Sequence, residues 1–68
     1  MDIEIVINGE TRTVSQGQTV LDLLKQLRLD PARVAVELDR HIVKQPRWPE
    51  TILHAGARVE IVQFVGGG

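Results

Sequence analysis

The segment "GQTVLDLLKQL", residues 17–27, decides the fold because it is a helix that must bury one side. Its apolar residues recur at spacings of three and four, so they form a single stripe along an α-helix. These residues are Val20, Leu23, Leu24 and Leu27. Thr19 precedes them as an N-cap, and Asp22 favours the positive end of the helix. We expect a helix of about ten residues that ends before Pro31, since the residue before a proline is pushed out of the α region.

Two strands joined by a tight turn precede this helix. Isoleucine recurs at every second position in residues 2–7, which is typical of a strand with one buried face. Asn8 and Gly9 can both take positive φ, so they predict a type I′ hairpin turn that returns through residues 10–15. A strict two-residue loop would pair Ile7 with Glu10, Ile5 with Arg12 and Ile3 with Val14, but only Val14 on the return strand is properly apolar, so the sequence leaves the register open.

Three further strands follow the helix. Residues 34–38 ("VAVEL") and 41–43 favour two strands with a turn between them. Residues 44–49 contain two prolines and should form a loop, and residues 49–53 could form one helical turn that begins at a proline. Residues 58–64 alternate at their start and predict the last strand.

The order of these elements indicates how they pack. A helix with one apolar stripe must lie on a sheet, and the helical link between the strand pairs suits a right-handed crossover between parallel neighbours. We predict an α+β roll of the β-grasp (ubiquitin-like) type, with a mixed sheet of roughly four to five strands packed on one main helix. The first and last strands should be adjacent and parallel in the middle. Residues 1–64 form this domain, and residues 65–68 form a flexible C-terminal glycine tail.

The composition excludes several classes of function. The chain has 68 residues, a formal net charge of -1 and no cysteine, which excludes disulfides and thiolate chemistry. Acidic and basic residues are interspersed, so no basic field favours nucleic acid or an anionic membrane. The apolar runs fall far short of the roughly 20 residues that span a bilayer. We expect a cytoplasmic protein that is a monomer when free.

The side chains that could support catalysis are few. His41 and His54 lie on different elements without carboxylates at ligand spacing, which argues against a metal site. The carboxylates have no spacing that would bring two of them together in a pocket. We therefore predict a protein that is not an enzyme, with no catalytic residue and no cofactor of its own. Trp48 lies in a loop, where it could cap the edge of the core or contact a partner.

The end of the last strand is more informative. If Val59 and Ile61 point into the core, alternation places Val62 and Phe64 on the opposite face. These exposed apolar groups, continued by Val65, predict a docking patch for a partner protein.

The chain then runs through Gly66, Gly67 and Gly68. Such an end could simply fray without a role. However, glycine has no Cβ, and the four residues from Val65 can project about 13 Å when extended, enough to enter a narrow channel. We predict that the carboxylate of Gly68 is a substrate. An ionised carboxylate is a poor electrophile, so a partner enzyme must convert it to an acyl-adenylate with ATP before a sulfur nucleophile can attack.

Five features together resemble the ThiS family of ubiquitin-like sulfur carriers in thiamine biosynthesis. They are "VING" (6–9), "GQTVLDLLKQL" (17–27), "VAVEL" (34–38), the loop tryptophan Trp48 and "VQFVGGG" (62–68). The resemblance covers essentially the whole chain and implies a β-grasp fold. One departure is Asp39-Arg40, which stands where family members often have Asn-Gly.

The resemblance also implies a reaction sequence. A ThiF-like adenylyltransferase would use ATP and Mg to adenylate Gly68, and a sulfur donor protein would supply the sulfur for a thiocarboxylate. A ThiG-like thiazole synthase would then receive that sulfur. Gly66 and Gly67 would enter the partner's active site, and Val62 and Phe64 match the apolar segment that precedes the tail in the family.

Three alternatives remain open from the sequence. The same chemistry could serve another pathway, as in the small subunit of molybdopterin synthase. The chain could be a protein modifier that joins Gly68 to lysines of its targets. It could also be a ubiquitin-like binding module in which the sheet alone carries the function.

Overall fold

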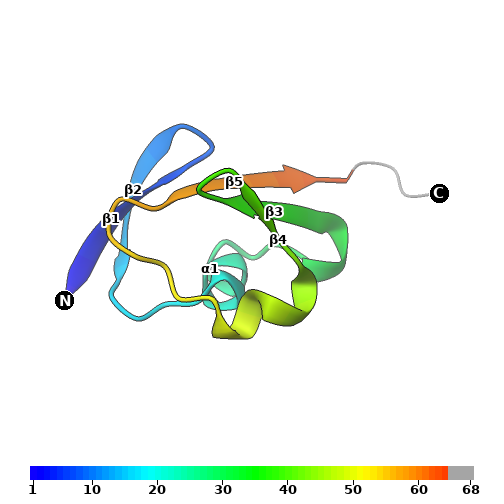
Figure 1. Ribbon diagram of the computed structural model, residues 1–68, viewed down its shortest axis with the longest axis horizontal. Helices are drawn as coiled ribbons and strands as arrows, with labels where there is room; N and C mark the ends of the chain where they lie inside the picture. Colours follow the sequence, from blue (N-terminus) through cyan, green and yellow to red (C-terminus); the bar gives the residue numbers. More distant parts are fainter. Residues whose placement is uncertain (65–68) are drawn as a thin grey trace.

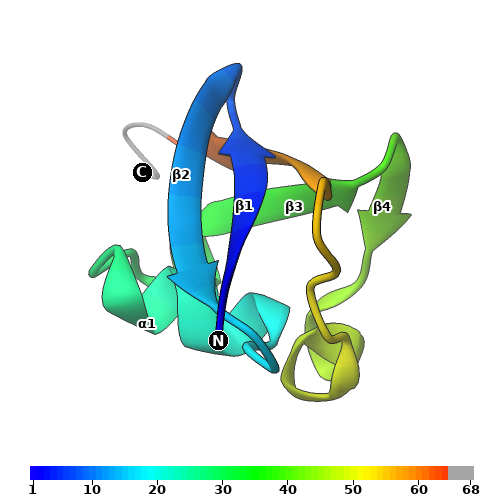
Figure 2. The same cartoon turned by 90° about the vertical axis from the view of Figure 1, so that its left-hand side faces the viewer.

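The computed structural model describes residues 1–64 and places them in one mixed sheet with a main helix against one face (Figure 1). The strands are β1 (Asp2–Ile7), β2 (Glu10–Ser15), β3 (Val34–Leu38), β4 (His41–Val43) and β5 (Arg58–Gln63). The helices are α1 (Val20–Gln26) and the two 3₁₀ segments η1 (Pro31–Arg33) and η2 (Gln45–Glu50). Both α1 and η2 lie on the same side of the sheet (Figure 2).

The sheet confirms the predicted β-grasp arrangement. Its strand order is β2-β1-β5-β3-β4, so the first and last strands lie in the middle, and they run parallel. The other neighbouring strands are antiparallel. The hairpin has the register of a strict two-residue loop, with Ile7 opposite Glu10, which the sequence had left open. Asn8 and Gly9 take φ values of 48° and 85°, as a type I′ turn requires.

The start of α1 is fixed by a reciprocal cap. The Asp22 backbone N–H donates to Thr19 Oγ1 at 3.1 Å, and the Thr19 N–H donates to Asp22 Oδ2 at 3.1 Å. This capping box satisfies donors that the first turn leaves without a partner in the helix. The apolar stripe then packs on the sheet, with Val20, Leu23 and Leu24 buried.

The predicted end of the helix is wrong by about one turn. α1 ends at Gln26 after seven residues, well before Pro31. Arg28 adopts a φ of 59°, and the Leu29 N–H donates back to the Leu24 carbonyl at 3.0 Å. This left-handed cap ends the helix several residues before Pro31. Glycine or asparagine usually marks such a cap, and the sequence has an arginine there, so nothing local indicated it.

The segment predicted to be a loop is also more regular than expected. Residues 45–50 form η2, with Pro49 inside it, so the single turn predicted over residues 49–53 does not exist. The 3₁₀ path turns Trp48 inward, where its side chain is 2% exposed. Its Nε1–H donates to the Val43 carbonyl at 2.7 Å. Trp48 is therefore a core residue, which resolves the two readings that the sequence allowed.

The core lies between the sheet, α1 and η2. It consists of Ile5, Ile7, Val14, Val20, Leu23, Leu24, Val34, Val36, Trp48, Leu53, Ala57 and Val59. Within residues 1–64 no polar or charged side chain is buried. The small apolar core is thus the main source of stability, and single losses inside it should be costly.

We expect the substitution Trp48→Phe to lower the free energy of unfolding by about 1–3 kcal/mol, because it removes the donor of the Val43 carbonyl and leaves part of the indole volume empty. Far-UV circular dichroism in urea measures this change, since the variant lacks the chain's one tryptophan. Phe64→Ser is the control, because Phe64 is 54% exposed. Equal stabilities for the two variants would contradict the assignment of Trp48 to the core.

Candidate functional site

The site is built on β5, which lies in the centre of the sheet. Val59 is 1% exposed and Ile61 packs against the core, whereas Val62 is 60% exposed on the opposite face. The alternation predicted from the sequence is therefore confirmed. Every residue of β3 pairs with a residue of β5, and Val34 lies opposite Gln63, the last residue of β5.

The end of β5 is anchored by one further backbone contact. The strand ends at Gln63, one residue earlier than predicted, but the Phe64 N–H still donates to the Arg33 carbonyl at 2.7 Å. Phe64 is 54% exposed beside this anchor. The remaining predicted site residues, Val65, Gly66, Gly67 and Gly68, lie outside the described residues. The structure therefore fixes the position of Phe64, the residue that precedes them.

Asn8 holds β5 from the other side. Its Nδ2 donates to the Ile61 carbonyl at 3.1 Å, and its Oδ1 accepts from the Ile61 N–H at 2.7 Å. The Asn8 backbone N–H also donates to the Val59 carbonyl at 2.9 Å. The side-chain amide thus continues the β1–β5 pairing past the turn. The sequence indicated only a turn role for Asn8, although an amide can supply both a donor and an acceptor to a strand.

The outer face of the sheet, the side away from α1, carries apolar and acidic groups together. Val62 lies opposite Ala35 on β3, and Ile42 on β4 is 76% exposed. Glu37 and Glu60 lie directly opposite each other, and neither forms an ion pair in the part of the chain that the structure describes. Because like charges at opposed positions are unfavourable, packing within the domain does not account for this pair.

A polar cluster fastens the turn between β3 and β4 to the start of β5. Asp39 Oδ1 accepts from the Arg58 N–H at 2.9 Å, and Asp39 Oδ2 lies 2.6 Å from His54 Nε2. His54 Nδ1 lies 2.9 Å from the Ala55 carbonyl. Both ring nitrogens therefore face acceptors, an arrangement that the imidazolium satisfies by donating from each. Asp39-Arg40 is the pair that departs from the family pattern, and Asp39 uses its carboxylate to fix this turn.

This cluster shifts two pKa values in opposite directions. The hydrogen bond to Asp39, followed by that to the Ala55 carbonyl, raises the pKa of His54 above 6.5. The backbone hydrogen bond from Arg58, followed by that from His54, lowers the pKa of Asp39 below 3.8. His54 is exposed, as predicted for both histidines. The cluster fastens the turn between β3 and β4 to β5.

A metal-binding cluster and a membrane-spanning helix are both absent from residues 1–64. Among residues 1–64 no three histidine or carboxylate side chains come together as a possible metal-binding group. No helix in that part of the chain is long and apolar enough to cross a membrane.

Comparison with known proteins identifies the family and several relatives of this chain. The profile described as "ThiS family" matches residues 5–68. The sulfur carrier protein ThiS of Escherichia coli K12 is 30% identical over 66 residues, which cover 97% of this chain and 100% of that protein. A crystal structure of the thiamine biosynthesis protein ThiS from Geobacter metallireducens superposes with a TM-score of 0.84 at 29% identity, covering 97% of this chain and 100% of that one.

Longer relatives contain the same segment. A thiazole synthase of Paramagnetospirillum magneticum is 41% identical over 66 residues, and one of Magnetococcus marinus is 33% identical over 66 residues. These residues cover 97% of this chain but only 20% of each thiazole synthase. The chain therefore spans about a fifth of the length of these relatives.

The Asp39–His54 cluster predicts a pH dependence of stability. The contribution of His54 is fully present below its unfolded pKa, near 6.5, and is lost as the pH rises through its higher folded pKa. That of Asp39 is present above its unfolded pKa, near 3.8, and is lost as the pH falls through its lower folded pKa. Melting temperatures should therefore be highest between these limits. His54→Gln should remove the decline on the alkaline side, and His41→Gln should retain it.

Proposed function

The chain belongs to the ThiS family, and from that premise we propose that it is a sulfur carrier of thiamine biosynthesis, with the sulfur held at the carboxyl carbon of Gly68. The observation that carries this proposal is the placement of β5. The central strand ends in a backbone anchor at Phe64, so the residues that follow leave from a fixed point on a rigid sheet. The chain itself is a substrate for its partners and not an enzyme.

The proposed reaction needs a partner for each step. A ThiF-like adenylyltransferase with ATP and Mg joins the carboxylate of Gly68 to the α-phosphate and releases pyrophosphate. Hydrosulfide released by a sulfur donor protein then attacks the carbonyl carbon and displaces AMP, which leaves a thiocarboxylate. A ThiG-like thiazole synthase accepts this sulfur. Activation is required because the ionised carboxylate is a poor electrophile with no good leaving group.

The residues of the chain have separate parts in this scheme. Gly66 and Gly67 have no Cβ, so they can pass through a channel that excludes larger residues. Val62, Phe64 and Val65 form the docking patch that sets where the tail begins. The exposure of Val62 and Phe64, at 60% and 54%, supports this role, since neither contributes to the core.

Intact mass tests the central step. After incubation with the activating enzyme, ATP and a sulfur source, the chain should gain about 16 Da as oxygen is exchanged for sulfur at the carboxylate. A variant with one alanine added after Gly68 should fold normally and gain nothing, because its carboxylate lies one residue away from the position that the enzymes take. No gain for the unaltered chain with an active partner would overturn the proposal.

The same incubation separates the carrier from a protein modifier. A modifier would transfer the activated carboxyl group to lysine side chains, and denaturing gels of cell extract would then show ladders of covalent adducts. We expect no such ladders. Their presence would contradict a function limited to sulfur transfer.

The docking patch has its own test. Val62→Asp should weaken binding to the activating enzyme by about tenfold or more, since it places a charge in an apolar contact, while the melting temperature stays nearly unchanged. Ile52→Asp is a matched control, because Ile52 is 62% exposed and lies outside the outer face beside Thr19. Isothermal titration calorimetry measures both affinities. Equal losses for the two variants would show that the patch is not specific.

A further inference from the structure

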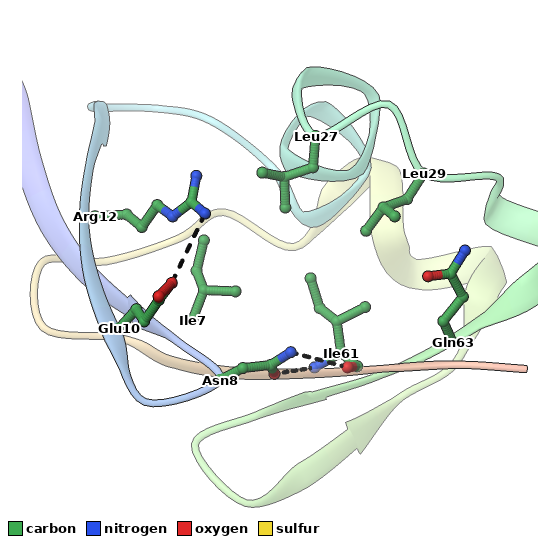
Figure 3. Close-up of a pocket in the computed structure, with 8 residues that line it drawn as sticks. All are labelled: Ile7, Asn8, Glu10, Arg12, Leu27, Leu29, Ile61 and Gln63. Carbon is green, nitrogen blue, oxygen red and sulfur yellow. Dashed lines mark hydrogen bonds and ion pairs between the residues drawn. The ribbon is translucent and has the colours of Figure 1, made fainter.

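A pocket lies beside the end of β5, on the side of the sheet that faces α1 (Figure 3). Its volume is about 280 Å³. The floor is apolar and is formed by Ile7, Leu27, Leu29 and Ile61, whereas the polar residues Asn8, Glu10, Arg12 and Gln63 complete the lining. A pocket of this composition suits an apolar side chain with a polar group next to it.

The pocket exists because α1 is short. The helix ends at Gln26, and Arg28 turns the chain away through its left-handed conformation. The hairpin end and the last part of β5 are therefore left without a helix over them. Leu27 and Leu29 remain only partly buried at this edge of the core.

The walls of the pocket are already fixed in the free domain. Asn8 bonds both backbone groups of Ile61, at 3.1 and 2.7 Å, and the Leu29 N–H bonds the Leu24 carbonyl at 3.0 Å. A partner that enters therefore does not have to order the floor, which reduces the entropic cost of binding.

The charge at the rim is available to a partner. The guanidinium of Arg12 lies 3.9 Å from Glu10 Oε1, and its side chain is 52% exposed. Such a long, exposed ion pair contributes little to stability, so the fork of donors can turn to another carboxylate. A partner carboxylate can therefore replace the exposed Glu10 as the acceptor for Arg12, next to an apolar side chain on the floor of the pocket.

The position of the pocket connects it with the tail. Gln63 lines the pocket, and the neighbouring Val62 is exposed on the outer face. An enzyme that takes the residues after Phe64 into its active site must surround the end of β5 and so meet both faces. The pocket and the docking patch that we proposed above therefore lie on opposite sides of the same strand end.

We propose that this pocket is the docking point for thiazole synthase, which inserts an apolar side chain over Leu27 and Leu29 and places an adjacent carboxylate on Arg12. The inference rests on the proposed function. We choose thiazole synthase as the partner because two longer relatives carry a similar segment within chains named thiazole synthase. The outer face, with Val62, remains available to the activating enzyme.

The affinity of the unmodified carrier for a separately purified thiazole synthase tests the pocket. Arg12→Glu should weaken this binding by about tenfold or more, because it reverses the charge at the rim. Lys44→Glu is the matched control, since it makes the same charge change at an exposed residue that does not line the pocket and has no ion pair in residues 1–64. A second variant, Leu29→Asp, tests the floor, and its melting temperature shows whether it folds.

The two enzymes provide the decisive contrast. The rate of the mass gain with the activating enzyme should be the same for Arg12→Glu and the unaltered chain. Unchanged affinity for thiazole synthase would overturn the proposal, and an equal loss with both enzymes would show that the pocket does not belong to thiazole synthase. Failure of the proposed function would give a different result, because the unaltered chain would then gain no mass at all.

Discussion

The pairing of β5 with both of its neighbours is the interaction on which the rest of the structure depends. β1 pairs with it at only two positions, opposite Arg58 and Val59, before the chain turns at the hairpin. The Asn8 amide then continues this pairing to Ile61. On the other side, β3 and the Arg33 carbonyl hold the strand as far as Phe64. The last strand is thus held on both edges almost to the point where the tail begins.

A domain of this size buries little apolar area, so hydrogen bonds in its turns are also needed to fix the fold. The core relies on a short helix and on Trp48, while the side chains of Thr19, Asn8 and Asp39 accept backbone hydrogen bonds that fix the connections between elements. The bonds to Asn8 and Asp39 join segments distant in sequence and fasten two turns to β5. The limited length of α1 is also what leaves the pocket beside β5 open.

Local patterns in the sequence were enough to predict much of this structure. The Asn8-Gly9 turn indicated the hairpin, the Thr19 cap indicated the start of the helix, and alternation in the last strand indicated the exposure of Val62. The rest depended on distant contacts. Asn8 binds a residue 53 positions away, Trp48 is buried by the path of a 3₁₀ segment, and an arginine takes the left-handed cap that glycine usually occupies. No local signal marks these features, and the pocket follows from them.

The carrier that we propose would meet two enzymes with one tail, so each enzyme would have to recognise it elsewhere. Glycine residues offer only backbone groups, so Gly66, Gly67 and Gly68 cannot distinguish one active site from another by their side chains. The distinction has to come from side chains close enough to be contacted while the tail is inserted. The end of β5 has two such surfaces with different chemistry, the apolar and acidic outer face around Val62 and the pocket below Arg12. Because they lie on opposite sides of one rigid strand, a substitution on one can leave the other intact. This arrangement allows two partners to be recognised by one small domain.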